Sequence, residues 1–508
     1  MQASDIIAVL PELILLAAAL AILLVEPLLK PGTAVAAANG DTGGETAPPA
    51  VSSPDRTPII AIALTGLAAS IAVSLVLSGQ TRVAFAGMLT LDHWAIFFKV
   101  LFGMTGLVTV LMSSGYLEAH RRHVGEYYAL LLFAVIGLDL MAAARDFILL
   151  YVAFELMSIS SYLLAAYFRH RVRSNESSLK YFLTGAFASA IMLYGISLAY
   201  GEAGSTNYKA IGQALGAQGG TAGVLFAVLL IGIGLAFKVS AAPFHMWTPD
   251  VYQGAPTPVT GFFAAGPKTA AFAVFIAAFV LAFPGAAHEW GVFFIVLSVI
   301  TMVVGNVFAL AQTNIKRMLA YSSIAHAGYI LGGLGAMGWS LNTYAGMGVL
   351  VYLTAYTFMN LGAFGVLAYL KAQNPDKFDY SLKQFAGLGR RSPWAAVLLS
   401  LFLLSLTGIP GTAGFIGKFY VFGGMVQADL VWLAVIGVVL SAVSAYYYLR
   451  VIIYMFFREP EEELPLRRPI SGSMAAALTI TAVATLAIGI VPSRLWDAVV
   501  SAFAALFS

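Results

Sequence analysis

The chain has 508 residues, of which 60% are hydrophobic and only 10% are charged, and its formal net charge is +3. A soluble globular chain carries roughly 25% charged residues, so this composition excludes an ordinary soluble domain and predicts a surface that faces lipid. The sequence contains no cysteine, which excludes disulfides, iron–sulfur clusters and thiolate metal sites. No basic run with interleaved aromatic residues indicates nucleic-acid binding.

Long apolar segments follow one another along the whole chain. A bilayer core needs about 20 apolar residues per helix, and by this measure the sequence predicts an all-α polytopic membrane protein of about fourteen transmembrane helices. The first segment, Ile6–Leu29, follows Asp5 and is too long for a signal peptide, so we expect it to be retained as a span. The predicted spans begin near Ile6, Pro58, Asp92, Glu126, Asp146, Ser177, Thr221, Pro256, His288, Lys316, Leu341, Pro393, Leu430 and Ile470.

Two connections are longer than the others. Residues 31–57 are rich in Ala, Gly, Pro and Thr, a composition that predicts a flexible loop without a packed core. The connection Gly201–Gly220 is expected to hold a short interfacial helix around Tyr208–Leu215.

Basic residues set the orientation of the predicted spans, because inner loops of membrane proteins are enriched in Lys and Arg. With the N-terminus outside, only Arg82, Arg145, Lys209 and Arg494 fall on the outer side. The bias predicts that both termini lie outside. The seventeen inner residues are Lys30, Arg56, Arg121, Arg122, Arg169, Arg171, Arg173, Lys316, Arg317, Lys371, Lys377, Lys383, Arg390, Arg391, Arg458, Arg467 and Arg468.

Six basic residues remain within predicted spans. Lys99 and Arg450 lie near span ends, where long side chains reach the interface by snorkelling. Lys238, Lys268 and Lys418 lie deep in their spans, where a lysine costs about 2.5–3.5 kcal/mol on insertion scales, so we expect them to be functional. For the sixth, Lys180 near the inner start of its span, the sequence leaves function and anchoring open.

Acidic residues and histidines add to these lysines. Glu155 is the main acidic counterpart, and an ion pair with a buried lysine that breaks and re-forms is one way to pass a proton. Asp139 and Glu26 lie near span ends and are expected to be interfacial. His245, two turns beyond Lys238, is predicted to relay protons.

For His326, in YSSIAHAGYI, a relay and a structural role both remain open. The hydroxyls of Ser322, Ser323 and Tyr329 could extend a wet path beside it.

Prolines interrupt two of the spans that carry buried lysines. Pro243 follows Lys238 in span seven, and Pro410 precedes Lys418 in span twelve, so both helices are expected to be broken. The two lie five spans apart, an odd offset that predicts two inverted five-helix repeats. The expected divisions are 1–125 (helices 1–3), 126–283 (first repeat), 288–458 (second repeat) and 470–508 (helix 14).

Five segments resemble subunit N of the proton-pumping NADH–quinone oxidoreductase family, respiratory complex I, and the resemblance extends from about Pro11 to Pro492. The stretch PFHMWTPDVYQGAPTPV is long and specific for this family. The segments are FELMSISSYLLAAY, NESSLKYFLTGAFASAIMLYG, FKVSAAPFHMWTPDVYQGAPTPVTGFFAAGPKTAA, NIKRMLAYSSIAHAGYI and SLTGIPGTAGFIGKFY.

The resemblance implies a role for each of the buried ionisable residues. Glu155 would pair with Lys238, and Lys418 would be the lysine of the exit half-channel. Between them, Lys268 would carry the connecting path.

Lys180 would belong to the same path, with His245 between Lys238 and Lys268. No redox cofactor is expected in this chain, because NADH, FMN, the iron–sulfur clusters and quinone would be bound by other subunits. The partners would be a neighbouring antiporter-like subunit, the small membrane subunits and membrane lipid, in a bacterial inner membrane or an organelle membrane of similar descent.

Two alternatives remain. A stand-alone cation/proton antiporter would share the repeat and its lysines, and would bind Na⁺ or K⁺ without a soluble redox arm. A purely structural membrane subunit would use the same charges as static ion pairs.

Overall fold

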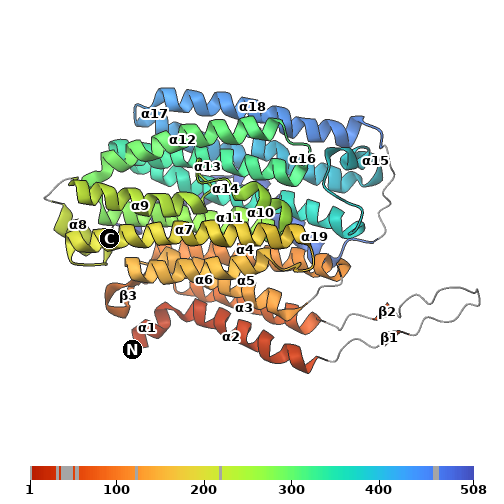
Figure 1. Cartoon of the computed structure of the whole chain (residues 1–508), viewed down its shortest axis with the longest axis horizontal. Helices are drawn as coiled ribbons and strands as arrows, with labels where there is room; N and C mark the ends of the chain where they lie inside the picture. The colour runs from red at the N-terminus through yellow and green to blue at the C-terminus, as the bar shows by residue number, and fades with distance from the viewer. Residues whose placement is uncertain are drawn as a thin grey trace, which may run out of the picture.

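The computed structural model describes residues 3–29, 34–35, 50–51, 56–120, 124–216, 220–460 and 468–507. Most of the predicted loop 31–57 and the basic residues Lys30, Arg121, Arg122 and Arg467 lie outside this described part. The helices lie side by side across the molecule, with α2 and α3 at one edge and α17 and α18 at the other (Figure 1).

The first half of the chain contains α1 (Ala3–Ala8), α2 (Leu10–Val25), η1 (Glu26–Leu28), β1 (Ala34–Val35), β2 (Ala50–Val51), α3 (Thr57–Val76), β3 (Arg82–Ala84), η2 (Phe85–Gly87), β4 (Leu89–Leu91), α4 (His93–Ala119), α5 (Gly125–Ala143), α6 (Phe147–Ala165), α7 (Val172–Ala203), α8 (Tyr208–Leu215), α9 (Ala222–Lys238), α10 (Thr248–Gly254) and α11 (Thr257–Ala282). The second half contains η3 (Pro284–Ala286), α12 (Ala287–Leu310), α13 (Ile315–Ser340), α14 (Thr343–Gln373), η4 (Leu382–Phe385), α15 (Leu388–Arg391), α16 (Pro393–Thr407), α17 (Ala413–Gln427), α18 (Val431–Phe457), α19 (Gly472–Ile490) and α20 (Ser493–Ala505). The only strands among the described residues pair as two small antiparallel sheets, β1 with β2 and β3 with β4.

The helices have the length and composition of membrane spans. Within the described ranges, eleven helices are long and apolar enough to cross a bilayer, and α9 and α16 are shorter apolar helices. The chain is therefore an all-helical polytopic membrane protein, as predicted. Each predicted span start lies near the start of a helix, and the short helix expected at Tyr208–Leu215 is confirmed as α8.

Capping side chains fix several helix starts, and two of them stand where the sequence predicts that a span begins. Asp92 accepts a hydrogen bond from the Ala95 amide at 2.8 Å, and Asp146 accepts one from Ile148 at 2.8 Å. A carboxylate at this position satisfies amides that have no partner inside the helix. The two caps therefore set the starts of α4 and α6.

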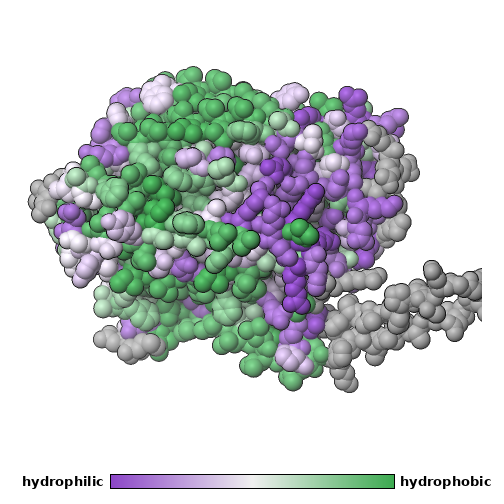
Figure 2. Space-filling model, in the orientation of Figure 1, coloured by the Kyte–Doolittle hydropathy of each residue, from purple (hydrophilic) through white to green (hydrophobic). Residues whose placement is uncertain are grey.

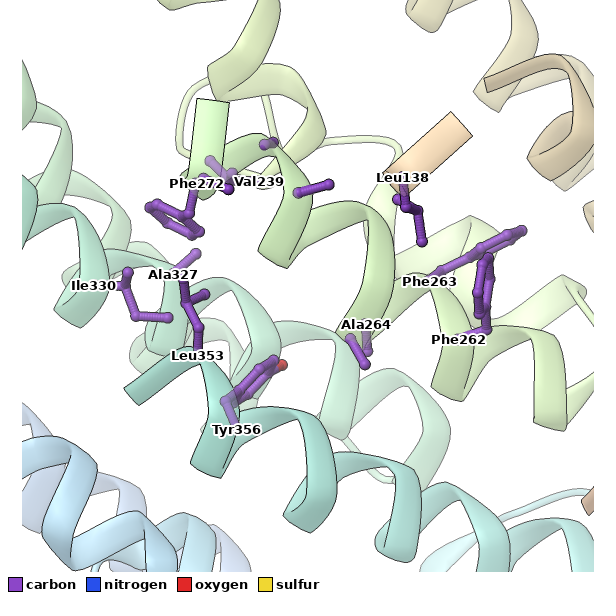
Figure 3. Packing of buried hydrophobic residues seen from close by; sticks show 14 of the residues in the cluster. Leu138, Val239, Phe262, Phe263, Ala264, Phe272, Ala327, Ile330, Leu353 and Tyr356 are labelled. Atoms are coloured by element: carbon purple, nitrogen blue, oxygen red, sulfur yellow. The ribbon is translucent and has the colours of Figure 1, made fainter. Parts of the chain in front are cut away.

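Helices α11 and α14 form the centre of the bundle and are buried along almost their whole length. Figure 3 shows Phe262 and Phe263 of α11 in this core, together with Leu353 and Tyr356 of α14. The helices around them keep apolar side chains on the surface, and Figure 2 shows this apolar surface over α7, α9, α12 and α18. Hydrophilic residues gather toward the end of the bundle where α10 and α15 lie (Figure 2).

The helical backbone stops at the two prolines that follow or precede buried lysines. Helix α9 ends at Lys238 and α10 begins at Thr248, with Pro243 between them. Helix α16 ends at Thr407 and α17 begins at Ala413, with Pro410 between them. Both gaps place backbone carbonyls without helical partners next to lysine-bearing segments.

Candidate functional site

Three lysines are buried in the middle of the bundle on three different elements. Lys238 is the last residue of α9, Lys268 lies in α11 and Lys418 lies in α17. Their exposed fractions are 2%, 1% and 5%. None of the three ammonium groups forms an ion pair within 4.0 Å among the described residues.

Aromatic rings surround Lys238. Its Nζ lies 4.8 Å from the ring centroid of Tyr181, 5.1 Å from that of Phe154 and 5.2 Å from that of Tyr162. The same Nζ donates to the Tyr181 hydroxyl at 3.3 Å. Ring faces attract a cation but carry no net charge that neutralises it, so Lys238 has cation–π contacts in place of a direct ion pair among the described residues.

Glu155 faces this region from α6, but it forms no ion pair with Lys238 within 4.0 Å in the described structure. The carboxylate accepts a short hydrogen bond from Ser189, which is also bonded to the Tyr151 hydroxyl at 3.1 Å. Glu155 still interacts electrostatically with Lys238 at longer range. The two groups therefore interact without direct contact, whereas the family resemblance implies that they pair.

Lys268 is held by α13. Its Nζ donates to the backbone oxygen of Ser323 at 2.7 Å and to the Ser323 hydroxyl at 2.5 Å. The ring of Tyr356 lies 5.8 Å away, and the hydroxyl of Tyr252 lies 3.4 Å from that of Ser323. Lys268 is thus connected to hydroxyl groups of α10 and α13.

His326 continues this set of polar groups one turn farther along α13. Its Nδ1 is 2.7 Å from the Tyr352 hydroxyl, and its Nε2 is 3.1 Å from the Tyr448 hydroxyl. Tyr448 forms a short hydrogen bond with Ser322, the residue next to Ser323. With both ring nitrogens hydrogen-bonded to groups that donate and accept, the imidazole is set up to pass a proton.

Lys418 closes the end of α16. Its Nζ donates to the backbone oxygens of Leu406 and Thr407 at 2.9 and 2.7 Å, and to the Ser441 hydroxyl at 2.7 Å. A cation is stabilised at a helix C-terminus because the last carbonyls have no partner inside the helix. A cavity of about 570 Å³ between α17 and α18 reaches Lys418 and Ser441.

Lys180 and His245 lie apart from this set of groups. The Lys180 side chain is 44% exposed on α7, where it pairs with Glu176 at 2.6 Å and Asp250 at 2.8 Å. His245 is half-buried between α9 and α10, and its Nδ1 has no hydrogen-bond partner within the described part of the chain. The structure therefore brings together five of the seven residues singled out in the sequence, in two groups.

Some members of these groups escaped the sequence analysis. The hydroxyl of Tyr181 bonds to Lys238, and those of Tyr352 and Tyr448 bond to His326, but isolated tyrosines in spans give no signal of such contacts. Lys316 and Lys371 were assigned to inner loops, and this was wrong: both lie in helices and are buried, with exposed fractions of 1% and 8%. Burial was hidden because each lies near a helix end.

Metal binding has no support in the described part of the chain, since it contains no group of three or more His, Asp or Glu residues arranged to hold an ion.

The comparisons with known proteins agree with this architecture. Residues 144–444 match the family described as NADH:quinone oxidoreductase/Mrp antiporter, transmembrane, and this range includes all seven candidate residues. The NADH-quinone oxidoreductase subunit N of Trichlorobacter lovleyi is 46% identical over 421 residues, which cover 82% of this chain and 85% of that protein. The chain belongs to this subunit N family.

Solved structures support the same assignment. A chain of respiratory complex I from Thermus thermophilus with bound aureothin is 35% identical, with a TM-score of 0.76, and the match covers 97% of this chain and 99% of that one. A chain of the Mrp complex from Dietzia shares the fold, with a TM-score of 0.83 at 19% identity, and covers 100% of this chain and 98% of its own. The family resemblance found in the sequence is confirmed.

Proposed function

We propose that this chain moves protons across a bacterial membrane as subunit N of NADH-quinone oxidoreductase, with no redox centre of its own. The observation that carries the proposal is the buried series of Lys238, Lys268 and Lys418, joined in part by hydroxyl groups and His326. A buried lysine without an anionic partner changes its charge state readily. Energy from NADH oxidation and quinone reduction in other subunits drives the movement.

Each residue of the series has a proposed step. Glu155 changes the charge state of Lys238 through the long-range interaction described above. The proton passes from Lys238 to Lys268 and then through Ser323, Ser322 and Tyr448 to His326. Hydrogen bonds support two parts of this path, from Lys268 to Ser323 and from Ser322 through Tyr448 to His326.

The last part of the path runs from His326 to Lys418 and outward. His326 interacts electrostatically with both Lys268 and Lys418, which supports a step of the path through this imidazole. Lys180 belongs to the inner part of the path, where Lys180 and Arg317 both bind Asp250, and His245 relays between Lys238 and Lys268.

The proposed topology has fourteen spans with both termini outside. Helices α9 and α10 form one interrupted span, the seventh, and α16 and α17 form another, the twelfth. The divisions are 1–125, 126–283, 288–458 and 470–508, and the second and third are inverted repeats. The gaps at Pro243 and Pro410 favour this arrangement, because irregular backbone at membrane depth is tolerated where it lines a cavity or polar path.

The partners are the other subunits of a bacterial respiratory complex I, and their placement follows from the family. We propose that a neighbouring antiporter-like subunit and the small membrane subunits contact this chain, and that NADH, FMN, iron–sulfur clusters and quinone are bound elsewhere. The large apolar surface of α7 and α18 is available for lipid or for these subunits.

Replacement of Lys238 tests the path. In the assembled complex, Lys238→Ala removes a buried proton carrier, and the number of protons pumped per NADH is expected to fall by at least several-fold. Proton uptake into vesicles and NADH oxidation are measured together. Lys209→Ala, which removes an exposed lysine of α8, is the matched control. Unchanged pumping in Lys238→Ala with full assembly would contradict the proposal.

The alternative function, a cation/proton antiporter, makes a different prediction. A chain of the Mrp complex shares the fold. A cation/proton antiporter would exchange Na⁺ or K⁺ for protons after purification without redox subunits. Purification of the tagged chain from its native membrane separates the two: NADH oxidation and flavin in the purified material favour complex I. Cation-dependent proton exchange without them favours the antiporter.

A further inference from the structure

A second group of ionisable side chains lies outside the path, in the helices that precede residue 144. Glu12 of α2, Lys99 of α4 and Asp139 of α5 have exposed fractions of 4%, 2% and 1%. Lys99 was expected to snorkel and Asp139 to be interfacial, and both side chains are covered by neighbouring helices. Helix packing covers all three side chains although each lies near a helix end.

Lys99 and Glu12 form a buried ion pair. Lys99 Nζ lies 2.7 Å from Glu12 Oε1, and it also donates to the backbone oxygen of Ala8 at 3.3 Å. The ammonium group and the carboxylate neutralise each other, so this pair adds no net charge to the interior. A third ionised group in the same place has no opposite charge left to neutralise it.

Asp139 is that third group. Neither of its carboxylate oxygens has a hydrogen-bond partner within the described residues, and the Glu12 oxygens accept no hydrogen bond beyond the ion pair. Helices α2 and α5 pack against each other, and Glu12 lines the same groove as Ile136 and Leu140, which lie about one turn before and one residue after Asp139 in α5. Glu12 and Lys99 also interact electrostatically with Asp139. A bare carboxylate at this depth is costly, whereas a protonated one has an O–H to donate and a carboxylate nearby that lacks donors.

We propose that Glu12 and Asp139 form a second proton-binding site, in which the two carboxylates hold one proton beside Lys99. With that proton the cluster is neutral, and without it the cluster carries one negative charge. The ligand is the proton itself, and the site is independent of the lysine series from Lys238 to Lys418.

The site lies toward one end of the bundle. Asp139 lies four residues before the end of α5 at Ala143, and Lys99 lies about two turns into α4. Ala144, the residue after α5, pairs with Leu89 of β4, and α4 begins two residues after β4, so both positions are near the end of the bundle that carries β3 and β4. In the proposed topology this is the outer side, where protons are released.

A groove gives a chemical probe access to the site. It has a volume of about 520 Å³, includes Glu12 in its wall and is otherwise lined by apolar side chains of α2, α5, α6 and the β3–β4 hairpin, among them Leu16, Ile136 and Leu140. An apolar carbodiimide partitions into such a groove. It reacts with protonated carboxyl groups and leaves carboxylates and amides unmodified.

The test uses the whole purified complex in lipid, with carbodiimide as the probe and mass spectrometry to locate the modified residue. We expect labelling at Glu12 or Asp139 that declines as the pH rises. Asp139→Asn removes the shared proton, so labelling of Glu12 is expected to disappear and one protonated-carboxyl band to vanish from infrared pH-difference spectra. Lys99→Met has the opposite effect, because Glu12 then also takes up a proton and the band grows.

Glu26→Gln is the matched control, since Glu26 pairs with Arg56 at 3.1 Å at the other end of α2. It is expected to leave both readouts unchanged. The proposal is overturned if labelling in Asp139→Asn equals that of the unaltered complex, or if Na⁺ at constant pH protects the site, which would make it a metal-cation site. Neither readout depends on pumping, so failure here and failure of the lysine path are distinguishable.

Discussion

The hydroxyl of Tyr448 lies between Ser322 and His326 and bonds to both. It bonds to Ser322 on one side and to His326 Nε2, at 3.1 Å, on the other. The ring itself is buried and packs against Tyr447 at a centroid distance of 4.5 Å. A hydroxyl can accept and donate at once, so this group can transmit a proton between Ser322 and His326 while the ring stays in place.

Tyr448→Phe removes this hydroxyl and keeps the ring. We expect assembly to be preserved and the maximal rate of proton pumping to fall about tenfold, because a lost hydrogen bond of about 1.4 kcal/mol in the transfer step has that effect on a rate. Pumping is measured in vesicles that contain the assembled complex. Tyr446→Phe, on the exposed side of α18, is the control; an equal effect of both changes would show that the hydroxyl of Tyr448 carries no proton.

The sequence predicts which charged residues are important, but it does not predict which hydroxyl residues contact them. Lys238, Lys268 and Lys418 were identifiable because a deeply buried lysine is costly and rare. Tyr181 and Ser441 were not, because hydroxyl residues are common in spans and only packing determines which lysine they contact. For the same reason the sequence does not determine the distance between Glu155 and Lys238, since spacing does not fix which way Glu155 turns in α6.

At the scale of secondary structure, cations repeatedly close helix ends. Arg450 of α18 donates to the backbone oxygens of Leu310 and Gln312, at the C-terminus of α12, at 3.1 and 2.5 Å. Lys316 donates to the backbone oxygen of Ala255 at 2.7 Å, just beyond the end of α10. Arg450 was expected to snorkel, and its guanidinium binds the backbone oxygens at the end of a neighbouring helix.

Arg450→Gln should destabilise the subunit without affecting the path. Loss of a charged donor at the end of α12 leaves carbonyls unsatisfied, and we expect a cost of about 1–3 kcal/mol and a lower midpoint of thermal unfolding. Unfolding is followed in the purified complex. Arg458→Gln, at the exposed C-terminal end of α18, serves as the control and is expected to unfold at the original temperature.

The sequence predicts where helices begin better than it predicts the depth of the gaps between them. The starts near Asp92 and Asp146 were found because apolar segments begin there, and both residues cap their helices. Pro243 lies between the end of α9 and the start of α10, and Pro410 lies between the end of α16 and the start of α17. The sequence contains no information on the depth of those gaps in a bilayer, which depends on how the whole bundle packs.

At the scale of the whole molecule, the direction of pumping follows from the topology, because a proton path is oriented by the sides on which it opens. The proposed arrangement places both termini outside and rests on the distribution of Lys and Arg in the sequence. It assigns the connection between α3 and β3 to the outer side and the connection around α15 to the inner side. These two connections therefore decide between the proposed orientation and its inverse.

The chain contains no cysteine, so single thiols can be introduced into the natural background. Thr81→Cys and Arg390→Cys both alter exposed positions, the second with a side chain that is 83% exposed. In intact inner-membrane preparations with the outer side accessible, a membrane-impermeant maleimide is expected to label the protein altered at position 81. The protein altered at position 390 should react only after the membrane is permeabilised. Labelling in the reverse order would invert the topology, and it would require that Lys418 open toward the inner side instead of the outer one.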